Sequence, residues 1–173
     1  MRFLPAGTLL ACFVSFAARA DLVFVSDERG DDVRVLSTED NTQVAVIAVG
    51  KRPRGMCTSL DRKTVYVALG DEDAVALVDV ASRKVVGRVP VGRDPEQVAL
   101  SPDGKVLYVS NEAASTATAV EIASQRKVFA SRVGTEPEGV GVAPSGRKVY
   151  VTGESSDDVT VLDARSGKVL RRF

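Results

Sequence analysis

The sequence contains no histidine and no tryptophan, and only two cysteines, Cys12 and Cys57. Without histidine the chain cannot supply a His-ligated haem, a histidine-based zinc site, or the general base of Ser-His-Asp and Cys-His nucleophilic machinery. It also lacks a glycine-rich phosphate loop of the required spacing, and it has no indole ring of the kind that commonly stacks on quinone cofactors. We therefore expect no catalytic residue, no metal ligand set and no bound cofactor in this chain.

An excess of charge of one sign is also missing. The 23 basic residues balance the 23 acidic ones, and 45% of the residues are hydrophobic, which is typical of a globular chain. Nucleic-acid-binding proteins usually carry a clear basic excess, so we expect no nucleic-acid partner.

Residues 1–20 have the pattern of a secretory signal peptide. Arg2 precedes an apolar run over residues 3–18, and a small-x-small cleavage signal ends at Ala20. The run is too short, and too interrupted by proline and glycine, to predict a transmembrane span. We expect export with cleavage after Ala20, and the alternative is lipoprotein processing at Cys12.

Cleavage after Ala20 would leave Cys57 as the one remaining cysteine, which excludes an intramolecular disulfide. Cys57 lies in an expected strand and has no histidine that could activate it. We therefore interpret it as a small, buried apolar residue rather than a reactive thiol.

The most informative positive feature is an internal repeat with a period of 42 residues. Several columns of residues keep this spacing in one register. They are Gly50, Gly92 and Gly134; Pro53, Pro95 and Pro137; Tyr66, Tyr108 and Tyr150, with Phe24 one period earlier; and Asp79, Glu121 and Asp163.

Each repeat contains four short alternating or apolar runs separated by turn residues. In the best-preserved copy these runs are residues 97–101, 106–111, 117–122 and 127–133, and the first turn is the Ser-Pro-Asp-Gly-Lys segment at 101–105. Strands of this length with tight connections leave no room for a helix. The repeat therefore predicts an all-β chain, a β-propeller of four-stranded antiparallel blades. We expect a signal peptide at 1–20 and blades at approximately 21–49, 50–91, 92–133 and 134–173.

The second strand of each repeat carries a recognisable motif. Its copies begin at Tyr66, Tyr108 and Tyr150, and the Tyr-Val-Ser-Asn copy at Tyr108 resembles the Tyr-Val-Thr-Asn signature of the YVTN-type β-propeller repeat. The proline-containing loops at 50–55, 94–96 and 136–139 are similar to those of bacterial periplasmic propellers associated with PQQ-dependent catabolism. This resemblance implies a periplasmic location and a role beside quinoprotein dehydrogenases in alcohol oxidation.

The number of repeats is small for a closed propeller. Residues 21–173 hold about 3.6 periods of 42 residues, whereas propellers usually have 4–8 blades and the family resemblance implies about seven. The first repeat lacks its innermost strand. We expect a partial propeller, a fragment of a seven-bladed one. The alternatives are a ring assembled from two chains and a four-bladed monomer, whose open blade edges would favour self-association.

The strand order places two sets of loops on one face, where the copies diverge in charge. This face is our candidate binding surface. Arg52 and Arg54 would offer forked donors to a carboxylate or phosphate, and Glu96, Glu136 and Glu138 would bind a cation or a basic partner. Arg93 completes this set of candidate residues. The competing interpretation is that these charges are solvated or form salt bridges between blades.

Three functional hypotheses follow from the sequence. The first is an exported, non-catalytic propeller that binds a protein partner, such as a quinoprotein dehydrogenase or a cytochrome, or a small ligand. The second is a fragment of a quinoprotein-like or lactonase-like propeller enzyme whose catalytic residues lie in blades that this sequence does not contain. The third is a cell-surface repeat protein.

Overall fold

The computed structural model describes residues 21–173. The expected signal peptide and the alternative lipidation site at Cys12 lie outside the described residues. The described chain forms four antiparallel sheets from fifteen strands, with one short 3-10 helix, Gly70–Glu72. Each sheet is made of strands that are consecutive in the sequence.

The four sheets are named blades 1 to 4 in chain order. Blade 1 contains β1 (Leu22–Asp27), β2 (Asp32–Ser37) and β3 (Gln43–Ala48). Blade 2 contains β4 (Pro53–Thr58), β5 (Thr64–Leu69), β6 (Ala74–Asp79) and β7 (Lys84–Pro90). Blade 3 contains β8 (Pro95–Leu100), β9 (Val106–Asn111), β10 (Thr116–Glu121) and β11 (Arg126–Arg132). Blade 4 contains β12 (Pro137–Val142), β13 (Lys148–Gly153), β14 (Asp158–Asp163) and β15 (Val169–Arg172).

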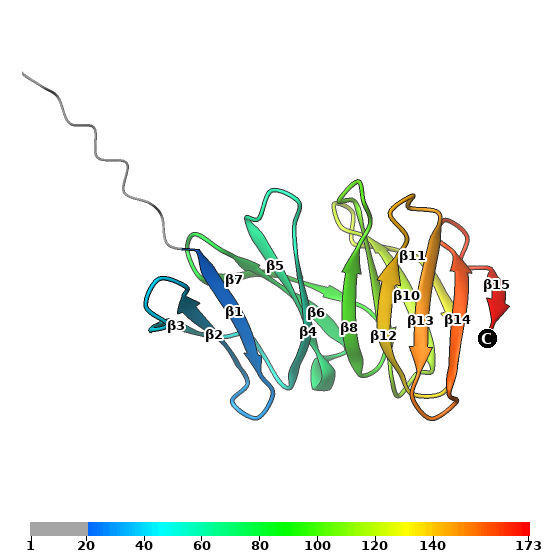
Figure 1. The fold of residues 1–173 in the computed structure, drawn as a ribbon, viewed down its shortest axis with the longest axis horizontal. Helices are drawn as coiled ribbons and strands as arrows, with labels where there is room; N and C mark the ends of the chain where they lie inside the picture. The colour runs from blue at the N-terminus through cyan, green and yellow to red at the C-terminus, as the bar shows by residue number, and fades with distance from the viewer. Residues whose placement is uncertain (1–20) are drawn as a thin grey trace, which may run out of the picture.

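This architecture confirms the predicted all-β propeller fold. The blades follow one another along the longest axis of the molecule, with blade 1 and blade 4 at opposite ends (Figure 1). The sequence predicted that no helix would form, whereas Gly70–Glu72 forms a single helical turn between β5 and β6. Such short 3-10 turns are common connectors. Among the described residues no helix is long and apolar enough to cross a membrane.

The strands begin close to where the pattern of the sequence places them, with one informative difference. β8 begins at Pro95, two residues before the predicted start at Gln97. Pro95 pairs with Asn111, and the register then shifts before Gln97 pairs with Ser110. This irregularity interrupts the alternation of side chains between the two faces of the strand. The alternation alone therefore did not reveal the first two residues of β8.

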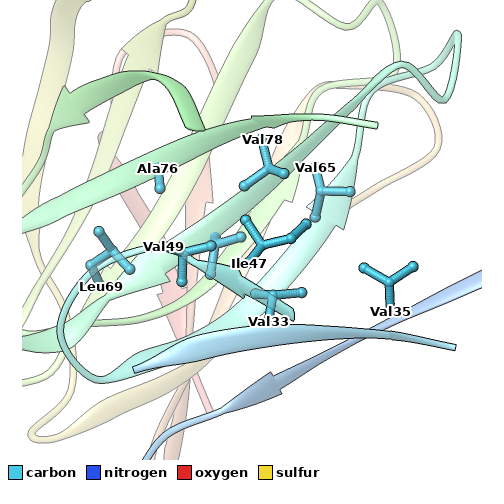
Figure 2. Close-up of a cluster of buried hydrophobic side chains, with 9 residues drawn as sticks. Val33, Val35, Ile47, Val49, Val65, Leu69, Ala76 and Val78 are labelled. Carbon is cyan, nitrogen blue, oxygen red and sulfur yellow. The ribbon is translucent and has the colours of Figure 1, made fainter. Parts of the chain in front are cut away.

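The hydrophobic core lies between the blades rather than within any one of them. Figure 2 shows Val33 and Ile47 of blade 1 pointing towards Val65 and Val78 of blade 2, and all four side chains are buried. Two further clusters fill the spaces between blades 2 and 3 and between blades 3 and 4. Each blade is therefore stabilised mainly by its neighbours, as in other repeat architectures.

Left-handed backbone conformations recur with the same 42-residue period, most of them at residues other than glycine. The recurring positions are Asp31, Asp73, Ser115 and Asp157; Asn41, Arg83, Gln125 and Gly167; Arg52, Asp94 and Glu136; and Arg62, Gly104 and Gly146. Such conformations are uncommon for residues with a side chain. The repeat therefore preserves backbone geometry even where it does not preserve the residue.

The connections between strands lie on two opposite faces. The mouth face carries the loops that enter β4, β8 and β12, together with the loops β1–β2, β5–β6, β9–β10 and β13–β14. The turn face carries the loops β2–β3, β4–β5, β6–β7, β8–β9, β10–β11, β12–β13 and β14–β15. In Figure 1 the mouth face is at the lower edge of the molecule and the turn face is at the upper edge.

Candidate functional site

The innermost strands β4, β8 and β12 bring three equivalent loops together on the mouth face. Each of these strands begins at a proline, so the residues immediately before and after it occupy matching positions in successive blades. The residue before the proline is Arg52, Asp94 or Glu136, and the residue after it is Arg54, Glu96 or Glu138. The charge at both positions therefore changes from basic to acidic between blade 2 and blade 3.

A hydrogen-bond pattern holds the residue before the proline in its left-handed conformation. The Arg52 amide donates to Asp31 Oδ1 over 3.0 Å, and the Arg52 carbonyl accepts from the Gly70 amide over 2.9 Å. The same pattern recurs one blade later, where the Asp94 amide donates to Asp73 Oδ1 over 3.1 Å. These bonds offset the strain of a positive φ at a residue other than glycine, and they aim side chains of two adjacent blades at each other.

Arg52 lies at the centre of an ion-pair network that joins three blades. Its guanidinium donates to Glu28 Oε1 over 3.1 Å and to Glu96 Oε1 over 3.0 Å, and it also pairs with Asp94. Glu112 Oε2 lies 3.8 Å from the same guanidinium. The donated hydrogen bond from Arg52 holds the pKa of Glu28 below its usual value. Arg52 therefore binds carboxylates of this chain.

Arg54 makes the second set of contacts between blades. Two of its guanidinium nitrogens contact Glu96 Oε2, a third donates to Glu28 Oε2 over 2.8 Å, and Glu138 Oε1 lies 3.9 Å away. Its contacts therefore reach blades 1, 3 and 4. We name the set Glu28, Arg52, Arg54, Asp94, Glu96 and Glu112 the mouth cluster.

Glu96 is the most deeply buried member of the mouth cluster, with its side chain only 4% exposed. Burial raises its pKa to about 7, and contact with the carboxyl of Glu112 acts in the same direction, while Arg54 and Arg52 oppose the shift. Because two guanidinium groups contact it, Glu96 ties the ends of blades 2 and 3 together in either protonation state.

A cavity of about 350 Å³ adjoins the mouth cluster. Residues of all four blades line it, and polar groups predominate. The lining residues are Ser26, Glu28, Pro53, Arg54, Gly55, Glu96, Gln97 and Glu138. The cavity is large enough for a small polar ligand.

Three carboxylates in this region have a spacing that resembles a metal site. One oxygen from each of Asp94, Glu96 and Glu112 lies within 4.8 Å of the other two. The guanidinium of Arg52 contacts all three groups, however, and already provides their positive counter-charge. This arrangement accounts for the acidic cluster without a metal ion.

Beyond the mouth cluster, the mouth face becomes acidic. Glu136, Glu138 and Glu154 form what we name the acidic rim, at the end of blade 4. Repulsion from Glu138, followed by burial and repulsion from Glu136, raises the pKa of Glu154 above its usual value. Among the described residues, the one cation paired with this rim is Arg54, at 3.9 Å from Glu138. The rim therefore carries negative charge that blade 4 itself does not neutralise.

The six candidate residues from the sequence fall into two groups. Arg52, Arg54 and Glu96 belong to the mouth cluster, and Glu138 borders it. Arg93 instead donates to the Ala113 carbonyl over 3.2 Å, and Glu136 accepts from the Ser155 hydroxyl.

Sequence reasoning did not single out three members of the mouth cluster, namely Glu28, Asp94 and Glu112. A usable signal was present, because Arg52 and Arg54 are each 42 residues before an acidic residue at the equivalent position. Equivalent positions of adjacent blades lie side by side, so opposite charges one period apart predict an ion pair.

The single cysteine of the described region is chemically protected. Cys57 lies in β4 and packs against the cluster between blades 2 and 3. Burial raises the pKa of its thiol to about 12. Little thiolate forms near neutral pH, so Cys57 is not suited to nucleophilic or redox chemistry.

Comparison with known proteins places the fold in a wider context. No curated protein matches the chain. Among solved structures, hydrazine synthase of Kuenenia stuttgartiensis is similar, with a TM-score of 0.81 and 21% sequence identity. The alignment covers 96% of this chain and 52% of the hydrazine synthase chain, so this chain spans about half the length of that protein. At this identity the similarity concerns the fold alone.

The family assignment comes from the sequence of the first three blades. A profile described as YNCE-like beta-propeller matches residues 4–135, which is most of the chain. The matched region includes the loops that carry Arg52, Arg54 and Glu96. Together with the propeller fold, this match shows that the chain belongs to the YNCE-like β-propeller family.

Proposed function

We propose that this chain is a non-catalytic binding or scaffold protein and that its mouth face is the binding surface. The observation that carries the proposal is the contrast between the mouth cluster, whose two guanidinium groups are paired within the chain, and the acidic rim, whose charge is largely unpaired. Unbalanced surface charge attracts an oppositely charged partner and accelerates its association. The expected partner therefore presents lysine or arginine side chains to Glu136, Glu138 and Glu154.

The contacts of the arginines make an external anion a weaker candidate ligand. A carboxylate or phosphate would have to displace Glu96, Glu28 or Asp94 from Arg52 and Arg54. Displacement would leave Glu96 buried without its counter-charges, which is costly. The acidic rim requires no such exchange, because Glu138 and Glu154 are exposed to solvent and Glu136 is half-buried with no ion-pair partner among the described residues.

We place this role in the periplasm, beside PQQ-dependent alcohol oxidation. Two features of the sequence support the placement. They are the signal-peptide pattern at residues 1–20 and the resemblance of the loops at 50–55, 94–96 and 136–139 to periplasmic propellers associated with PQQ. A quinoprotein dehydrogenase or a cytochrome with a basic docking surface is the proposed partner, and the chain itself holds no cofactor in this proposal.

The test measures direct binding of the purified chain to a purified quinoprotein alcohol dehydrogenase and to the cytochrome that accepts its electrons. Surface plasmon resonance at several salt concentrations is suitable. We expect binding to one of the two, with an affinity that falls as salt rises. The double variant Glu136→Lys, Glu154→Lys should bind at least tenfold more weakly.

A matched control separates local charge from net charge. Glu39→Lys, Glu121→Lys makes the same change in net charge on the turn face. This control should bind like the unmodified chain. Equal loss of binding in both double variants would refute a specific role for the acidic rim, and no binding to either protein would refute the proposed partners.

A further inference from the structure

A second cavity lies on the turn face, at the junction of blades 3 and 4 and on the side of the propeller opposite the acidic rim. Its volume is about 450 Å³. Blade 3 contributes residues of β9, β10, β11 and the β8–β9 loop, and blade 4 contributes the β12–β13 and β14–β15 loops. We name it the turn-face cavity, and its size suits a small organic molecule.

The most buried part of the lining, which we call the floor, is apolar. Val106, Tyr108 and Val128 of blade 3 pack there in the same hydrophobic cluster as Ala164 of blade 4. The Tyr108 hydroxyl donates to the Ala164 carbonyl over 3.0 Å, so these two polar groups already satisfy each other. A bound molecule would therefore meet hydrocarbon surface on the floor.

Charged side chains surround the floor, and the two carboxylates among them are held by their own turns. Asp103 Oδ1 accepts from the Ser101 hydroxyl over 2.6 Å, and Glu121 Oε2 accepts from the Ser124 hydroxyl over 2.6 Å. Glu121 also has a counter-charge in Arg126, at 3.7 Å. Neither carboxylate is therefore well placed to receive a ligand.

The remaining charged group of the lining is Arg165, in the β14–β15 loop. Its backbone amide donates to Asp163 Oδ1 over 3.2 Å, and the Ser166 hydroxyl donates to the same oxygen over 2.7 Å. Within residues 21–173 the guanidinium of Arg165 forms no ion pair and no hydrogen bond, and the residue is exposed. Arg165 therefore offers a forked pair of donors to an anionic group.

The other two blade interfaces differ from this one at two adjacent positions. Where blade 4 has Ala164 followed by Arg165, blade 2 has Val80 followed by Ala81, and blade 3 has Ile122 followed by Ala123. Val80 and Ile122 pack against the hydrophobic clusters of their own interfaces. Alanine in place of these branched side chains leaves apolar space, and the arginine that follows it adds a cation beside that space.

We propose that the turn-face cavity binds a small organic carboxylate with an apolar body, of the arylacetate type. Its carboxylate accepts two hydrogen bonds from the guanidinium of Arg165, and its apolar body covers Val106 and Val128 on the floor. An inorganic anion would leave the floor uncovered, and an organic cation would be repelled by Arg165. This site is separate from the partner-binding surface proposed on the mouth face.

The primary test is a titration of the ¹⁵N-labelled chain with phenylacetate, followed by amide chemical shifts. We expect saturable shifts at residues that line the turn-face cavity, with a dissociation constant of about 1 mM or lower, in keeping with a ligand of this size. Phenylacetamide keeps the ring without the charge, and inorganic phosphate keeps an anion without the ring. Each should bind at least tenfold more weakly than phenylacetate.

Two substitutions give the cavity the residues of the other interfaces. Arg165→Ala reproduces Ala123 and should weaken phenylacetate binding at least tenfold, while Ala164→Ile reproduces Ile122 and should prevent saturable binding by filling the floor. Arg29→Ala removes an exposed guanidinium from the mouth face and should bind like the unmodified chain. Circular dichroism checks folding, and the exposed position of Arg165 keeps the first variant interpretable if the second is destabilised.

Several outcomes would overturn the proposal. One is the absence of saturable shifts up to about 10 mM phenylacetate, well above the expected dissociation constant. Phenylacetamide or phosphate that binds as tightly as phenylacetate would refute joint recognition of charge and apolar body. Binding that survives Arg165→Ala would place the ligand elsewhere. The acidic rim lies on the opposite face, so the failure of this test and the failure of the partner-binding test are distinguishable.

Discussion

The two faces of the propeller use polar side chains in different ways. On the turn face, the carboxylate contacts join residues close together in the sequence, as in the β8–β9 turn, where Asp103 Oδ1 accepts from Ser101 Oγ over 2.6 Å and from the Lys105 amide over 3.2 Å. On the mouth face, Arg52 contacts Glu28 and Glu96, which are 24 and 44 residues away. The carboxylates of the turn face stabilise individual turns, whereas those of the mouth cluster join one blade to another.

The surroundings of Glu96 and of the turn aspartates also shift their pKa values in opposite directions. The Ser101 hydroxyl, which donates to Asp103, holds the pKa of that carboxyl below its usual value. Asp79 and Asp163 lie in the β6–β7 and β14–β15 turns, where the hydroxyl groups of Ser82 and Ser166 donate to them, and their pKa values are lowered as well. Burial raises the pKa of Glu96 instead. Local contacts thus favour charge on these turn aspartates, whereas burial opposes charge on Glu96.

The largest effect should come from removing a guanidinium group from the mouth cluster. Arg54→Ala leaves Oε2 of Glu96, whose side chain is 4% exposed, without its ion-pair partner. Breaking a buried pair in this way should lower the free energy of unfolding by about 3 kcal/mol at pH 8, where Glu96 is ionised. Urea denaturation measures this change.

The matched substitution on the turn face is Arg126→Ala. Arg126 lies 3.7 Å from Glu121, and the two side chains are 65% and 43% exposed. An exposed pair of this kind should contribute less than about 0.5 kcal/mol. Equal losses in the two variants would contradict the distinction between the faces.

A second comparison uses two glycines of the innermost strands. A β-carbon at Gly55 would lie only 2.7 Å from the Glu96 carbonyl oxygen, whereas one at Gly141 would meet nothing within 4 Å. Gly55→Ala should therefore cost about 1–3 kcal/mol through overpacking between β4 and β8, and Gly141→Ala should be close to neutral. Thermal unfolding of both variants tests this, and a neutral Gly55→Ala would show that the strands near the mouth cluster can separate at little cost.

Glu96 and the turn aspartates should also give pH dependences of opposite sign. Between pH 4.5 and about 7 the folded chain retains a proton on Glu96 that the unfolded chain has lost, so stability should fall as pH rises. One such proton changes the free energy of unfolding by at most about 1.4 kcal/mol per pH unit. The turn aspartates stay ionised when folded, so their contribution is lost as pH falls below 3.8.

Two variants test which residues cause these changes of the free energy of unfolding with pH. Glu96→Gln should flatten the dependence between pH 4.5 and 7, and Asp103→Asn should weaken the loss below pH 3.8. Urea denaturation across this pH range provides the measurement. An unchanged slope in Glu96→Gln would mean that another group carries the dependence.

The smallest predicted effect is a gain in stability on the turn face. Arg62 has a φ of 58°, while glycine occupies the equivalent left-handed positions Gly104 and Gly146. Arg62→Gly should relieve this strain and stabilise the chain by roughly 0.5–1 kcal/mol, because the relief exceeds the added entropy of the unfolded state. The reverse change, Gly104→Ala, should destabilise the chain by a similar amount in the same denaturation assay.

The sequence predicted the fold because the repeat reports on local structure. Tyr108, Pro95 and the Ser101 turn fix one strand or one connection each, and their 42-residue spacing identifies the blade. The mouth cluster was only partly predictable, because the partners of Arg52 and Arg54 depend on which side chains of neighbouring blades meet at the mouth. Burial of Glu96 likewise results from packing between blades, which no single repeat encodes.

The ion pairs one period apart have a consequence for how this array can change during evolution. Arg54 pairs with Glu96 because the residues at equivalent positions of blades 2 and 3 differ in sign. Tandem duplication of blade 2 would place one arginine beside another, and duplication of blade 3 would place a buried glutamate beside a second one. The blades have similar backbones, but these charges require blade 2 to be followed by blade 3. Unequal recombination that changed this order would therefore be selected against.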